Sequence, residues 1–88
     1  MRYIKNGEME FMLNDDGEQV VFEPETGDTH FLNETAAAFI EKLDTGDFKA
    51  VLSALAEEYG VQPDEIETDV KELVTELLAK KIISELVQ

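Results

Sequence analysis

Few side chains in this sequence could perform catalysis. The one histidine, His30, falls in an extended segment with no nucleophile close to it in the sequence, so a surface or strand-edge position explains it better than a general base. Ser53 lies in an apolar helical stretch and Ser84 in the C-terminal tail, and neither stands at the strand–turn–helix elbow that activates a nucleophilic serine. We therefore expect that the protein is not an enzyme.

Carboxylates and a glycine gather at residues 14–18, which invites comparison with a calcium-binding loop. If Gly17 took the sixth position of such a loop, the first ligand would be Met12 and the ninth Val20, neither of which supplies a charged oxygen. A β-hairpin turn explains the cluster better. Because the sequence also lacks cysteine, zinc-ligand spacing and a glycine-rich phosphate loop, we expect no metal and no cofactor.

The chain is strongly acidic, with 21 Asp and Glu residues against 7 Lys and Arg and a net charge of −14. The acids are spread along both halves, so no basic face is hidden by an acidic tail. Such a surface repels the phosphates of nucleic acid, and we expect no nucleic acid partner. Two explanations of the charge stay open, namely a solvated surface that keeps a small protein soluble, and attraction for a cationic partner surface.

Length and hydropathy indicate a single domain that covers residues 1–88. Hydrophobic residues make up 43% of the sequence, which is enough for a modest core. No apolar run reaches the length of a signal-peptide core or of a membrane-spanning helix. We therefore expect a cytoplasmic protein with no membrane partner.

The first third of the chain predicts strands. Apolar residues recur at every second position in residues 9–13 and again in residues 19–23. Turn-forming residues at 14–17 and 24–28 separate these segments from each other and from residues 29–32. The pattern predicts a three-stranded antiparallel meander with residues 29–32 at one edge.

The remaining two thirds predict three helices. Asn33 can cap a first helix that ends at Gly46, and Asp47 can cap a second that ends at Gly60. Pro63 suits the first turn of the third and longest helix. Together the elements predict an α+β, winged-helix-like fold in which a three-stranded antiparallel meander is followed by three helices.

The third helix carries an apolar stripe wider than one core contact needs. Its core-facing positions are Ile66, Val70, Leu73 and Leu77. Val74 and Leu78 extend the apolar surface on one side only, next to Lys71. Two explanations stay open, namely that the sheet or the tail at residues 82–87 covers this flank, or that the flank forms one wall of a groove.

Residues 32–37, Leu-Asn-Glu-Thr-Ala-Ala, resemble the Leu-Asn-x-Thr-Ala-Ala signature of the PqqD-like family, small peptide-binding proteins also called RiPP recognition elements. The likeness covers roughly residues 9 to 84. The other matching segments are Gly27 to Leu32 (third strand), Asp44 to Phe48 (helix junction) and Asp69 to Ile83 (last helix). The chain departs from the family at Thr45, which is inserted in the helix junction, and at Lys80 and Lys81. Residues 22–38 resemble the variety found with HPr-kinase-like proteins.

The resemblance implies a non-enzymatic peptide chaperone. Such proteins hold the leader segment of a ribosomally made precursor peptide between the third strand and the third helix, and present it to a modifying enzyme, often a radical SAM enzyme. An exposed strand edge suits this role because an extended peptide can add to it as a further strand. We take the strand positions from the resemblance and the helical ones from the widened stripe. The expected peptide-binding residues are Thr29, His30, Phe31, Leu32, Lys71, Val74 and Leu78.

Two other functions stay open. A regulatory or assembly module would use the same strand edge for a folded partner or for self-association. An acyl carrier protein would need an Asp-Ser-Leu attachment site, whereas Ser53 stands between Leu52 and Ala54. Leader peptides of the PqqD-like family are frequently acidic, so with a charge of −14 either the bound segment is apolar and basic or its affinity is modest.

Overall fold

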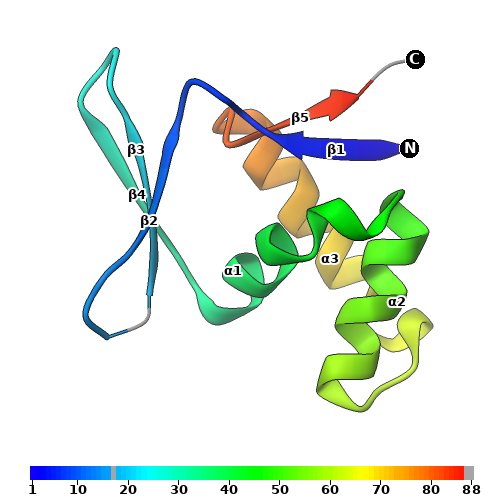
Figure 1. Cartoon of the computed structure of the whole chain (residues 1–88). Coiled ribbons are helices and arrows are strands. Elements are labelled where there is room, and N and C mark those ends of the chain that lie inside the picture. The colour runs from blue at the N-terminus through cyan, green and yellow to red at the C-terminus, as the bar shows by residue number, and fades with distance from the viewer. Residues whose placement is uncertain (17, 87–88) are drawn as a thin grey trace.

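A strand meander and three helices make up most of the chain, which the computed structural model describes over residues 1–16 and 18–86 (Figure 1). The meander consists of β2 (Glu10–Leu13), β3 (Gln19–Glu23) and β4 (Asp28–Leu32), in that order. The helices are α1 (Glu34–Glu41), α2 (Phe48–Tyr59) and α3 (Pro63–Ala79), and the 3-10 helix η1 (Leu43–Thr45) lies between the first two. A separate two-stranded sheet pairs β1 (Arg2–Lys5) with β5 (Ile83–Leu86). The predicted α+β fold is confirmed.

The pairing of the meander places alternate side chains on two faces. Val21 on β3 is opposite Phe11 on β2 and His30 on β4. Its side chain is fully buried in the core cluster, so this face is the inner one. The residues between these positions point to the opposite, outer face of the sheet.

A polar side chain shapes the first turn of the meander, and a glycine allows the second. The oxygen Oδ1 of Asn14 accepts hydrogen bonds from the backbone N–H groups of Asp16 and Glu18, at 3.0 and 2.9 Å. Gly17, which belongs to the predicted hairpin turn, lies outside the described residues. In the second turn Gly27 has a φ of +79°, a conformation that glycine adopts without strain.

The predicted helix starts are confirmed. The side chain of Asn33 accepts a hydrogen bond from the N–H of Ala36 at 2.8 Å, so β4 runs into α1 with one residue between them. Asp47 caps α2 in the same way, through the N–H of Ala50 at 3.0 Å. Gly60 ends α2 with a φ of +69°, in the left-handed region that suits a helix C-terminus.

The first helix, α1, ends at Glu41, before its predicted end at Gly46. The N–H of Lys42 lies 3.2 Å from the carbonyl oxygen of Ala38 and 3.1 Å from that of Phe39, so the hydrogen-bond ladder tightens and continues as η1. Gly46 follows η1 with a φ of +157°. A Cβ at this glycine would lie 3.0 Å from the Cβ of Ala50, which leaves little room for a side chain where α2 begins.

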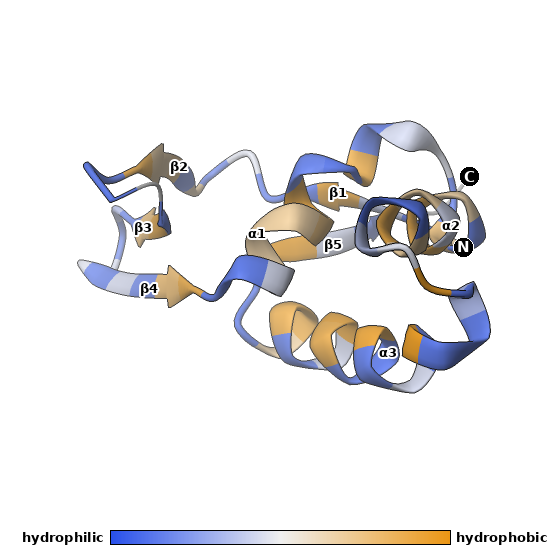
Figure 2. Cartoon of the chain, turned by 90° about the horizontal axis from the view of Figure 1, so that it is seen from below, coloured by the Kyte–Doolittle hydropathy of each residue, from blue (hydrophilic) through white to orange (hydrophobic). Residues whose placement is uncertain are grey.

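The pairing of β1 with β5 was not predicted from the sequence. It is extended by a hydrogen bond of 3.0 Å from the N–H of Asn6 to the carbonyl oxygen of Ile82. Ile82 and Ile83 are fully buried, and Tyr3 on β1 belongs to the same core. Figure 2 shows the hydrophobic side of α3 turned toward α1 and β5, so the core lies between these layers. Over the described residues, no helix is both long enough and apolar enough to cross a membrane.

Candidate functional site

The hydrogen-bond alternation of the meander determines which groups of β4 point away from the sheet. In an antiparallel ladder, hydrogen-bonded pairs alternate with pairs that are not bonded to each other. The N–H of Asn14 donates to the carbonyl oxygen of Glu18 at 2.9 Å, which makes this pair a hydrogen-bonded one. Because bonded pairs recur at every second position from this pair, residues 20 and 22 of β3 also bond to β2. Val21 lies between them and directs its N–H and C=O groups toward β4.

The same alternation leaves Thr29 and Phe31 with backbone groups directed at the free edge. His30 is opposite Val21 and therefore bonds to β3, so its two neighbours direct their N–H and C=O groups outward. Within residues 1–16 and 18–86, no further strand pairs with this side of β4. Figure 2 shows β4 as the strand of the meander on the side of α3. The predicted edge is thus present, and it is a template for an added strand.

The four predicted strand residues divide between the two faces of the sheet. Leu32 is 7% exposed and His30 is half-buried, both on the inner face. Thr29 and Phe31 are exposed on the outer face. An added strand would place its own side chains alternately on these two faces. One face of that strand would meet the helical core and the other would meet solvent.

The three predicted helical residues line one apolar depression together. Lys71, Val74 and Leu78 border a volume of about 360 Å³. Its remaining lining residues are Met1, Tyr3, Phe48 and Thr75. Within the described part of the chain, no residue of β4 lines this depression. The three helical residues therefore lie next to β1 and the start of α2. In this depression they do not meet the four predicted residues of β4.

Sequence reasoning missed the N-terminal residues of this depression, Met1 and Tyr3. The hydroxyl of Tyr3 donates to the sulfur of Met1 at 2.8 Å, and burial together with the charge of Glu85 raises the pKa of that hydroxyl. Tyr3 and Ile4 are residue types that favour strands, and this short run is a signal that could have located them. It lies before the segment on which the family resemblance rests.

Lys71, at the rim of the depression, is held by a neighbouring carboxylate. Its Nζ lies 2.8 Å from Oε2 of Glu67, one turn earlier on α3. The hydrogen bond from Lys71, and next its positive charge, lower the pKa of the Glu67 carboxyl. Both side chains are solvent-exposed, so this ion pair orients the ammonium group more than it stabilises the fold.

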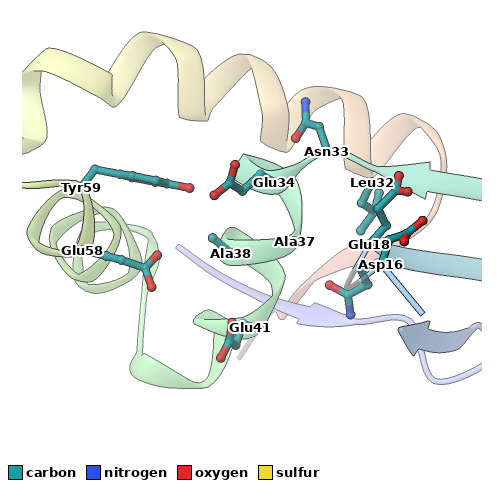
Figure 3. A pocket seen from close by; sticks show the side chains of 11 residues that line it. Asp16, Glu18, Leu32, Asn33, Glu34, Ala37, Ala38, Glu41, Glu58 and Tyr59 are labelled. Atoms are coloured by element: carbon teal, nitrogen blue, oxygen red, sulfur yellow. The ribbon is translucent and has the colours of Figure 1, made fainter. Parts of the chain in front are cut away.

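A larger depression, of about 760 Å³, lies where β4 ends. Its acidic lining residues are Asp16, Glu18, Glu34, Glu41 and Glu58. Figure 3 shows Glu34 and Glu41 on α1 itself, with Glu58 and Tyr59 on one side of this helix and Asp16, Glu18 and Leu32 on the other. Lys42 forms an ion pair with Glu58 at 3.3 Å. Because Leu32 is the last residue of β4, a peptide leaving the edge at this end meets a surface that attracts cations.

Across residues 1–16 and 18–86, no cluster of His, Asp or Glu has the geometry of a metal site. His30 lies at the strand edge, as predicted, and lines neither of the two depressions. The chemistry available at β4 is that of backbone hydrogen bonding and apolar contact.

Comparison with known proteins identifies one family and two solved structures that the chain resembles. Residues 18–83 match the family described as coenzyme PQQ synthesis protein D (PqqD). A solved structure described as lasso peptide synthetase B1 complexed with the leader peptide is 27% identical, has a TM-score of 0.80 and covers 97% of this chain and 100% of that one. TbiB1 in complex with the TbiA(beta) leader peptide shares the fold, with 20% identity, a TM-score of 0.79 and coverage of 97% and 99%. No curated protein matches the chain.

Proposed function

The chain belongs to the PqqD family, and from this premise we propose that it binds the leader segment of a ribosomally made precursor peptide and presents it to a modifying enzyme without catalysing the modification itself. The observation that carries the proposal is the open edge of β4, whose outward groups are those of Thr29 and Phe31. The similar lasso peptide synthetase B1, which is described in complex with a leader peptide, supports it.

Binding occurs by strand addition. The leader pairs with β4 through the N–H and C=O groups of Thr29 and Phe31, which make no hydrogen bond within the meander. Each such bond contributes about 0.5–1.5 kcal/mol net, because both partners were bonded to water before binding. Backbone bonding is independent of side chains, so selectivity comes from the two faces on either side of the edge.

Lys71 and Leu78 enter the proposal as contacts for a more distant part of the leader, and Val74, which is 5% exposed, forms part of the floor beneath them. Their depression is apolar and lies on α3 next to β1, away from the edge of β4. The longest dimension of the molecule is 38 Å. At about 3.3 Å per extended residue, roughly twelve residues of peptide cross that distance. One leader can therefore occupy the strand edge and the helical depression together.

An isotope-labelled titration tests the proposal. The protein is titrated with the peptides encoded by short reading frames beside its gene, and backbone amide signals are followed. We expect the largest changes in residues 27–32, because new hydrogen bonds form there. Unchanged signals throughout this segment, with binding detected elsewhere, reject the strand edge. Light scattering that rises with protein concentration in the absence of peptide would instead favour the self-association module. The class of the modifying enzyme, a radical SAM enzyme by resemblance, stays a prediction.

A further inference from the structure

An apolar row crosses the outer face of the meander and ends at the free edge. Met12 on β2 and Phe31 on β4 are both opposite Val20 on β3. Phe31 is 70% exposed and Met12 is 48% exposed, whereas Val20 between them is 9% exposed. An aromatic ring left mostly in water at the margin of a sheet lacks the packing that such side chains usually find.

Strand addition would supply that packing. Residues directly opposite each other in neighbouring strands place their side chains on the same face, with Cβ atoms about 4.5–5.5 Å apart. The peptide residue opposite Phe31 therefore projects onto the outer face, beside the exposed ring. The residues before and after it project toward the inner face, where His30 and Leu32 lie.

We propose that the bound peptide carries an aromatic or large aliphatic residue opposite Phe31, and that this residue extends the row formed by Met12, Val20 and Phe31 onto the added strand. The inference rests on the proposed function and adds a selectivity rule for one position of the peptide. In this arrangement Phe31 contributes both a backbone hydrogen bond and a side-chain contact, so it determines which register of the peptide is bound.

The charge of the protein favours a peptide over a second copy as the occupant of this row. Each copy carries a net charge of −14. Glu10, in the neighbouring outer-face row, and Glu18, just before β3, add carboxylates near the apolar row. Two such surfaces in contact would bring like charges together, whereas an apolar or cationic peptide would not.

A selection from a library of short random-sequence peptides tests the inference without knowledge of the natural leader. The immobilised full-length protein is used for selection, and enriched peptides are confirmed by amide shifts in residues 27–32. Each confirmed peptide is then bound to wild-type protein, to Phe31→Ser and to Leu13→Ser. Leu13 is the matched control, because it is 72% exposed but lies on β2 at the opposite edge of the meander.

We expect every confirmed peptide to contain an aromatic or large aliphatic residue that couples to Phe31. Replacing that residue by alanine, or Phe31 by serine, should weaken binding about five- to tenfold, and making both changes should weaken it little further. Leu13→Ser should leave the affinity unchanged. Because both substituted side chains are exposed, the variants should keep the thermal stability of the wild type.

Two outcomes would overturn the inference. If Phe31→Ser binds the selected peptides as tightly as wild type while the β4 amides still shift, strand addition stands and the selectivity rule is wrong. If the wild type sediments as a dimer that Phe31→Ser converts to a monomer, the row is a self-association surface. Failure of the proposed function looks different, since then no selected peptide shifts the amides of residues 27–32.

Discussion

Replacing Thr29 by proline should weaken peptide binding while leaving the fold intact. The N–H of Thr29 points to the free edge and makes no bond within the meander, so proline removes a donor that only an added strand would use. The residue before it, Asp28, already lies in a strand, which is the conformation that a following proline favours. One lost backbone hydrogen bond costs about 0.5–1.5 kcal/mol, which corresponds to an affinity about two- to twelvefold lower.

Two matched variants separate this effect from general damage. Thr29→Ala keeps the backbone donor and should bind as wild type, because the side chain of Thr29 is exposed. His30→Pro removes an N–H that bonds to β3 and should lower the free energy of unfolding by about 1–3 kcal/mol. Binding is measured by fluorescence anisotropy with one labelled peptide, and folding by thermal denaturation. Equal affinity of Thr29→Pro and Thr29→Ala would refute the edge-strand geometry, as would loss of folding in Thr29→Pro but not in His30→Pro.

Three further outcomes follow from the structure. Asn33→Ala removes the side-chain acceptor for the N–H of Ala36 and should lower the free energy of unfolding by about 1 kcal/mol, measured by denaturant titration; an unchanged midpoint would contradict the cap. The Glu67 carboxyl should titrate below its usual range by NMR, and Lys71→Gln should raise its pKa again. Because folding lowers the pKa of Glu67, the ion pair stabilises the folded protein at pH values above the pKa of this carboxyl in the unfolded chain. This stabilisation is lost as the pH falls through the pKa of the carboxyl in the folded protein. With a net charge of −14, the protein should select cationic peptides whose affinity falls as salt is added, and an affinity independent of salt would contradict electrostatic selection.

Sequence reasoning succeeded where the structure depends on neighbouring residues. Asn33 and Asp47 cap helices through N–H groups three residues away, so their role is visible in the sequence itself. The meander joins strands that follow one another along the chain, and its order therefore follows from the turns. The edge position of residues 29–32 was predicted for the same reason, and the observed strand begins one residue earlier, at Asp28.

The parts that were not predicted depend on contacts between distant residues. β1 pairs with β5 from the other end of the chain, with Tyr3 opposite Glu85, and a strand of four residues gives a weak signal alone. This pairing also determines what borders the flank of α3, since Met1 and Tyr3 share a depression with Val74. The sequence pattern predicted an apolar flank on the third helix, and Val74 and Leu78 of that flank line this depression. The pattern did not contain the position of the N-terminal strand, and the pairing of the flank with the third strand came from the family resemblance.

The open edge and the high charge of this protein are best understood together. An unpaired strand is a template for any other unpaired strand, and two copies of β4 would satisfy each other's backbone groups as well as a peptide does. Strands in a sheet lie about 4.8 Å apart, which is within the Debye length of about 8 Å at physiological salt, so charges beside two approaching edges repel with little screening. A net charge of −14 on each copy opposes self-pairing without blocking a single N–H or C=O of Thr29 and Phe31. We therefore expect the charge to keep the edge available, and the same repulsion predicts that added salt promotes pairing between copies while it weakens the binding of any cationic peptide.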